Sequence, residues 1–97
     1  MITKVSEIKV EDIADYIRIS EIDDALKKEL NIYLNVAKKF VKDETGLTDL
    51  DSHEDFIIAI YVLCQDMYDN KSLYVDKSNL NKVVDTILGR HRNNLLW

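Results

Sequence analysis

Apolar side chains recur at three- and four-residue steps along most of this chain, a spacing that lines one face of an α-helix. Four segments show the pattern, at about residues 10–17, 20–45, 52–68 and 80–88. The second is the longest, and the third has an apolar face broad enough to indicate a central, mostly buried helix. We therefore predict an all-α fold, a small bundle of about four helices in which the two longer central helices pack antiparallel.

Polar and glycine residues predict where the second and third helices begin and end, because the chain contains no proline. Ser20 followed by Asp23 resembles a capping box, in which side chains accept hydrogen bonds from the first free amide groups of a helix. Gly46 is expected to close the second helix, since glycine readily takes the left-handed conformation that ends helices. Asp51 or Ser52 can cap the third helix.

The chain after the third helix is expected to leave the helical conformation twice. A polar break at residues 68–72 is followed by an extended-looking stretch at residues 73–75, and Ser78 or Asn79 then caps the fourth helix. Gly89 is expected to end or bend that helix, which leaves residues 90–97 as a candidate interaction tail. The inner face of the fourth helix is expected to consist of Leu80, Val83, Val84, Ile87 and Leu88.

Length and composition indicate a single folded domain over residues 1–97. A chain of 97 residues is a usual size for one domain and too short for two separate cores. Its composition, 46% apolar and 32% charged, is that of a folded protein. We find no signal peptide and no run near the ~18 apolar residues of a membrane span, so we expect no membrane partner. The residues expected in the core include Leu30, Leu34, Phe56, Ile60 and Leu63.

The net charge of −5 argues against a general nucleic-acid binder, because phosphate binding is driven largely by lysine and arginine. The charge is unevenly spread along the chain. Residues 1–24 carry three basic and seven acidic side chains, a net of −4, whereas residues 77–97 carry four basic and one acidic, a net of +3. Two oppositely charged faces would suit a subunit that meets its neighbour head to tail, and ordinary scatter of surface charge is the simpler alternative.

The sequence offers little for catalysis, and we expect neither an enzyme nor a bound cofactor. Nucleophilic catalysis needs a nucleophile beside a base, and the histidines His53 and His91 lie in no recognisable motif. Cys64 falls on an apolar helical face, where cysteine behaves as a small hydrophobic residue. His53 beside Glu54 resembles a solvated helix cap, and zinc would require further histidine or cysteine ligands. We therefore predict no catalytic site and no metal site.

A small helical DNA-binding regulator is the alternative from a different functional class. Short helices with tight connections are the material of helix-turn-helix domains, and the basic residues Arg90 and Arg92 could contact phosphate. Against this hypothesis, no predicted helix presents the face of arginine, lysine, asparagine and glutamine that reads a DNA groove.

Three stretches occur in an order that is typical of one family. Residues 10–19 read VEDIADYIRI, residues 23–46 open with an acidic pair and close with AKKFVKDETG, and residues 67–71 read MYDNK. In that family a short opening helix is followed by a long helix that ends in Ala-x-x-x-Val/Ile-x-x-x-Thr-Gly. A third helix ends in an aromatic residue, an acidic residue, Asn or Asp, and arginine. The three stretches are similar to these three helices, in the same order. With Lys71 in place of that arginine, the chain resembles the head-tail connector family of long-tailed phages, the DNA-packaging or head-completion adaptors, over nearly its whole length.

The resemblance implies a structural virion protein that forms a homo-oligomeric ring below the portal, connects the phage head to the tail and extends the DNA channel. The implied partners are further copies of the chain, the portal protein and a tail-side completion protein. DNA would pass through by non-specific contact. The implied location is the virion, and the host cytoplasm during assembly.

Apolar residues that have no place in a four-helix core suggest where such a ring would make contacts. One group lies in the non-helical stretch at residues 73–75, and another lies beyond Gly89 at residues 95–97. Either group could instead fold back over the core as a lid. The candidate interface residues are Leu73, Tyr74, Val75, Arg90, Arg92, Leu95, Leu96 and Trp97.

Overall fold

Residues 2–91 of the chain are described by the computed structural model. Two short 3-10 helices precede the first and the last α-helix. In chain order the elements are η1 (Val5–Glu7), α1 (Val10–Ile17), α2 (Asp24–Thr45), α3 (Asp55–Asn70), η2 (Lys77–Asn79) and α4 (Lys82–His91). This part of the chain contains no strand, so the predicted all-α fold with two longer central helices is confirmed.

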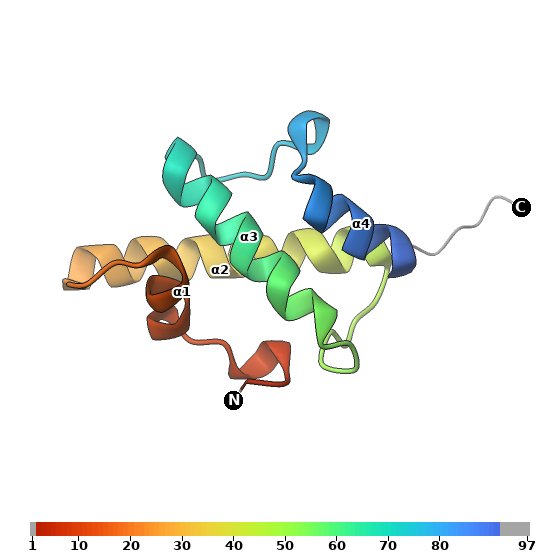
Figure 1. Ribbon diagram of the computed structural model, residues 1–97, viewed down its shortest axis with the longest axis horizontal. Helices are drawn as coiled ribbons and strands as arrows, with labels where there is room; N and C mark the ends of the chain where they lie inside the picture. Colours follow the sequence, from red (N-terminus) through yellow and green to blue (C-terminus); the bar gives the residue numbers. More distant parts are fainter. Residues whose placement is uncertain (1, 92–97) are drawn as a thin grey trace, which may run out of the picture.

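The long helices α2 and α3 form the centre of the bundle. α3 runs back across α2 in the opposite sense, and α1 and α4 lie on opposite sides of α3 (Figure 1). α1 packs against α2 and α3, while α4 packs against α3 and more lightly against α2. α3 therefore contacts every other α-helix, which explains the broad apolar face that its sequence shows.

The core lies where α3 faces the other helices. The side chains expected there are all buried, with exposed fractions between 0% and 4%: Leu30, Leu34, Phe56, Ile60 and Leu63. Val5 and Ile8 from the N-terminal segment and Leu50 from the α2–α3 loop complete the same cluster. Thr45 is a buried polar residue whose hydroxyl donates a hydrogen bond to Val41 O at 2.7 Å, so its burial leaves no unsatisfied group.

The start of α2 differs from the prediction, whereas its end at Gly46 agrees with it. Asp23 caps the helix, because its Oδ1 accepts a hydrogen bond from Leu26 N at 2.8 Å. The helix therefore begins after Asp23, and the prediction that it begins at Ser20 was wrong. At the other end Gly46 has a φ of 72°, in the left-handed region, and its amide donates to Lys42 O at 2.8 Å as expected.

α3 begins later than predicted because its expected caps bind elsewhere. Asp51 accepts hydrogen bonds from Ser6 N at 2.9 Å and from Ser6 Oγ at 2.7 Å. These bonds tie η1 to the α2–α3 loop and hold the pKa of the Asp51 carboxyl below its usual value. Ser52 Oγ lies 3.5 Å from Asp49 O, and Glu54 occupies the N-cap position of α3 without a side-chain hydrogen bond.

The prediction that Gly89 ends the last helix was wrong. α4 continues through Gly89 to His91, and the backbone of Gly89 is not in the left-handed region. A glycine inside a helix costs only about 1 kcal/mol, and the contacts of Arg90 and His91 with Asp55 hold the last turn in place. Arg90 therefore belongs to α4 and not to a tail. The other tail residues predicted for the interface, Arg92, Leu95, Leu96 and Trp97, lie outside the described residues.

Candidate functional site

The α3–α4 connection (residues 71–81) carries the first group of candidate interface residues. Lys71 ends α3 in a left-handed conformation with a φ of 52°, and Ser72 N donates a hydrogen bond to Met67 O at 3.1 Å. This closing turn directs the chain away from the axis of α3. Residues 73–75 are non-helical, as predicted.

Leu73 and Tyr74 form an exposed apolar patch, which we name the connection patch. Their exposed fractions are 59% and 67%, high values for side chains of this size. Val75 differs, because it is half-buried and packs against the core. The exposure expected for this stretch therefore holds for Leu73 and Tyr74, whereas Val75 covers the core as the lid alternative proposed.

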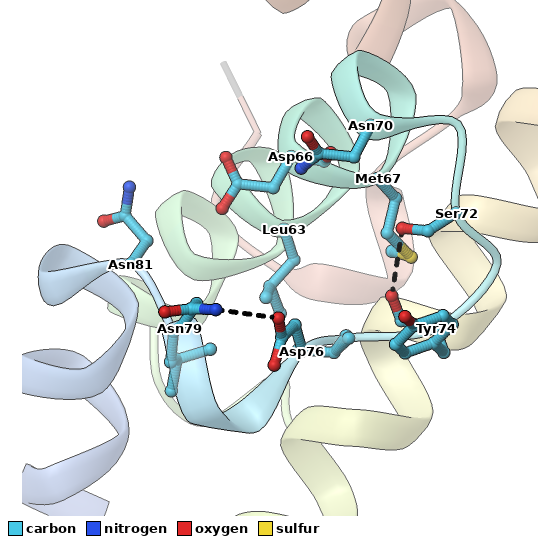
Figure 2. Close-up of a pocket in the computed structure, with 11 residues that line it drawn as sticks. Leu63, Asp66, Met67, Asn70, Ser72, Tyr74, Asp76, Asn79 and Asn81 are labelled. Atoms are coloured by element: carbon cyan, nitrogen blue, oxygen red, sulfur yellow. Dashed lines mark hydrogen bonds between the residues drawn. The ribbon is translucent and has the colours of Figure 1, made fainter.

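Asp76 organises the second half of the connection (Figure 2). Its Oδ2 accepts a hydrogen bond from Asn79 Nδ2 at 3.1 Å, which Figure 2 shows as a dashed line. Its Oδ1 accepts hydrogen bonds from Ser78 N at 3.1 Å and Ser78 Oγ at 2.7 Å. These bonds, first of all those from Ser78, hold the pKa of Asp76 below its usual value. Ser78 and Asn79 thus belong to η2, and Asn81 Oδ1 instead accepts the hydrogen bond from Val83 N, at 2.8 Å, where α4 begins.

A hollow of about 380 Å³ lies between the connection and the C-terminal half of α3. Leu63 and Met67 point toward it from α3, and the chain at Tyr74 passes along its far side (Figure 2). Asp66 also lines the hollow, and burial, together with the charge of Asp69, raises the pKa of Asp66. The connection is therefore held by its hydrogen-bonded turns rather than by close packing along its whole length.

Lys71 anchors the start of the connection to α2. Its Nζ lies 3.5 Å from Glu29 Oε2 and 4.2 Å from the centre of the Tyr68 ring. Tyr33 OH donates a hydrogen bond to the same Glu29 oxygen at 2.7 Å. Burial of Tyr33, and then its bond to Glu29, raise the pKa of the phenol to about 12. Lys71 therefore makes a partly exposed ion pair with Glu29, at a position where the family that the chain resembles more often has arginine.

A second exposed apolar surface, between α3 and α4, was missed by the sequence reasoning. Ile58 and Val83 are 52% and 49% exposed, and with Ile87 they line a shallow hollow of about 380 Å³. Val83 was expected on the inner face of the last helix, and that prediction was wrong. Val84, Ile87 and Leu88 are buried on the inner face, and Val83 lies outside it, about 100° around the helix from Val84.

The start of α3 and the end of α4 bring together His53, Asp55 and His91, which we name the histidine cluster. His91 Nε2 lies 2.8 Å from Asp55 Oδ2, and the ring centres of His53 and His91 are 4.2 Å apart. Phe56 lies edge-on against both imidazole rings. All three residues of the cluster are half-buried. Arg90 Nη1 lies at the rim, 3.8 Å from Asp55 Oδ2.

The sequence could not reveal the histidine cluster, because Asp55 and His91 are 36 residues apart and meet only through the packing of α4 on α3. Cys64, the other candidate for chemistry, is 0% exposed. Burial raises the pKa of its thiol to about 12, so the thiol stays protonated at neutral pH. Cys64 therefore behaves as the small hydrophobic residue that its position predicted.

Among residues 2–91, no helix is both long enough and apolar enough to cross a membrane. Comparison with known proteins found no family model, no curated protein and no solved structure that matches the chain. The likeness to phage head-tail connectors accordingly stands on the three sequence stretches described above.

Proposed function

We propose that this chain is a non-enzymatic structural subunit of a tailed-phage virion, which assembles into a ring below the portal, connects head to tail and extends the DNA channel. The connection patch is the observation that carries the assembly part of the proposal. Leu73 and Tyr74 are 59% and 67% exposed, so neither side chain is buried in the core of the subunit. Exposed apolar clusters of this kind mark contact surfaces.

The way the connection is held supports its use as a contact surface. Hydrogen bonds at Ser72 and Asp76 and the ion pair of Lys71 fix the chain on both sides of the patch. A surface that is already ordered loses little conformational entropy when it binds, so more of the contact energy appears as affinity. Tyrosine is also among the residues that contribute most to protein interfaces.

Charge supports a ring in which each subunit meets its neighbour through two different faces. The acidic side chains Glu11 and Asp15 are exposed on α1, and the basic side chains Lys82 and Arg90 are exposed on α4. α1 and α4 lie on opposite sides of α3 (Figure 1). Opposite charges on opposite sides favour head-to-tail contact, which closes into a ring when the rotation between subunits allows it.

The described residues give the DNA-binding regulator less support. Lys77 Nζ pairs with Glu44 Oε2 at 2.9 Å, and Arg90 Nη1 lies 3.8 Å from Asp55 Oδ2. Basic side chains that are already paired with carboxylates release fewer counterions on contact with phosphate. An acidic ring subunit can still line a channel, because DNA passage requires weak and non-specific contact.

The proposal is tested by the double variant Leu73→Ser/Tyr74→Ser in the full chain. Truncation of each side chain at a ring contact is expected to cost about 1–2 kcal/mol, which corresponds to roughly 30- to 1000-fold weaker association for the pair. The readout is sedimentation velocity at matched concentration, with and without the portal protein. Circular dichroism checks that the helix content is unchanged.

Ile32→Ser is the matched control, because Ile32 is 44% exposed on α2 and lies outside the connection. We expect this variant to assemble and to dock on the portal as the unaltered chain does. If the double variant assembles as well as the unaltered chain, or if Ile32→Ser is equally damaging, the connection patch is not the contact surface.

A further inference from the structure

The histidine cluster offers three metal-ligating side chains at one place. His53 lies in the turn before α3, Asp55 is the first residue of α3, and His91 lies in the last turn of α4. One ligand atom from each residue lies within 4.8 Å of the other two. Two imidazoles and one carboxylate form a donor set that zinc accepts, with a fourth position left for water.

The distances in the cluster fit a tetrahedral ion after small side-chain rotations. Zinc bonds of about 2.0–2.1 Å place neighbouring ligand atoms roughly 3.3 Å apart. His91 Nε2 and Asp55 Oδ2 are 2.8 Å apart, slightly closer than that, and all three ligand atoms lie within 4.8 Å of one another.

His53 is the residue that a structural ion pair alone leaves unexplained. The pair between Asp55 and His91 would hold α4 against α3 without it. Within residues 2–91, the His53 ring contacts Phe56 and His91, and its two ring nitrogens form no hydrogen bond. The His53 imidazole is half-buried and lies beside the His91–Asp55 pair. This is the position expected of a third metal ligand.

We propose that His53, Asp55 and His91 bind one Zn²⁺ ion. The ion joins the start of α3 to the end of α4, and it holds in place the α4 surface that carries Val83. Water occupies the fourth position. This site does not depend on the ring assembly, so the two proposals succeed or fail separately.

Arg90 sets the affinity of the site. Its guanidinium lies 3.8 Å from Asp55 Oδ2, and a positive charge beside the carboxylate opposes a divalent cation. The Arg90 side chain is 62% exposed, so it can turn into solvent when the ion binds. Zinc binding should therefore strengthen when this charge is removed.

The test is a titration of the full chain with Zn²⁺ against a chromophoric chelator, combined with thermal unfolding with and without Zn²⁺. We expect one equivalent to bind and to raise the midpoint of thermal unfolding, because an ion that binds the folded state stabilises it. His53→Gln and Asp55→Asn should each weaken zinc binding by at least about tenfold. Loss of a residue that only orients a metal ligand already weakens binding by about that factor, and loss of the ligand itself should weaken it at least as much. Arg90→Gln should tighten it.

Two control variants separate this site from general attraction of the ion to an acidic chain. Glu54→Gln removes the same charge as Asp55→Asn from the adjacent residue, which makes no side-chain cap, and should leave binding unchanged. Cys64→Ser removes the buried thiol and should also have no effect. The proposal is overturned if the unaltered chain binds no zinc, or if His53→Gln, with its helix content intact, binds as tightly as the unaltered chain.

Discussion

Leu63 and Leu30 allow the packing described above to be tested by a ranking of two core substitutions. Both side chains are buried, with exposed fractions of 1% and 0%. Both belong to the core cluster, Leu30 on α2 and Leu63 on α3, and Leu63 also borders the hollow under the α3–α4 connection. A leucine beside an existing hollow has fewer packing partners on that side, so its loss removes fewer contacts.

The expected magnitudes follow from transfer and cavity terms. Leucine to alanine removes three carbon atoms, worth about 2.4 kcal/mol at ~0.8 kcal/mol per methylene. A new cavity in a close-packed core adds up to about 2.5 kcal/mol, at ~24 cal/mol per Å³ for roughly 100 Å³. We therefore expect Leu30→Ala to cost about 4–5 kcal/mol and Leu63→Ala about 2–3 kcal/mol. Both losses are large beside the ~5–15 kcal/mol by which domains of this size are stable.

The assay is urea unfolding followed by far-ultraviolet circular dichroism, with the free energy of unfolding extrapolated to water for each variant. An unchanged slope against urea would show that the unfolded state is the same in both variants. A loss under about 0.5 kcal/mol for Leu63→Ala would refute its placement in the core. A larger loss for Leu63→Ala than for Leu30→Ala would refute the argument from the hollow.

Three further outcomes are expected from the fold. Gly89→Ala should stabilise the protein by about 0.5–1 kcal/mol because Gly89 is helical with open space at its Cβ position, whereas Gly46→Ala, at a φ of 72°, should destabilise it by about 1–2 kcal/mol; urea unfolding measures both. The pKa of Tyr33 is raised to about 12 in the folded protein, whereas the unfolded phenol ionises near 10.0. Between these pH values unfolding releases a proton, so the stability of the protein falls as pH rises. Tyr33→Phe should remove this part of the decline, and unfolding midpoints measured over a series of pH values check it. The Cys64 thiol should react with a disulfide reagent only at the rate at which the protein opens, and rapid labelling of the native protein would contradict its burial.

Helical periodicity was sufficient to predict the four helices, because each buries one continuous face. In α2 and α3 the apolar residues recur at helical spacing, so they share one face only when the chain is helical. Gly46 ends α2, as the sequence predicted. Helix starts were harder. Ser20, Asp51 and Ser78 each resemble caps, yet Asp51 and Ser78 form hydrogen bonds with other partners, and the choice among neighbouring polar residues depends on such contacts.

The contact surfaces were predicted in part. The non-helical stretch that exposes Leu73 and Tyr74 follows from the polar break before it, a signal that lies in the local sequence. The outward position of Val83 depends on which of two adjacent valines faces α3, and the histidine cluster depends on how far α4 runs along α3. Tertiary packing decides both, and the sequence pattern of a single helix does not contain them.

Assembly into a ring is tested most directly by negative-stain electron microscopy of the concentrated protein, alone and with the portal protein of the same phage. We expect closed rings that form in a concentration-dependent way and stack on the end of the portal through which DNA passes. A chain that stays monomeric in both samples would contradict the account. Binding to duplex DNA tighter than about 1 μM that weakens steeply with salt, by that same monomer, would favour the regulator instead.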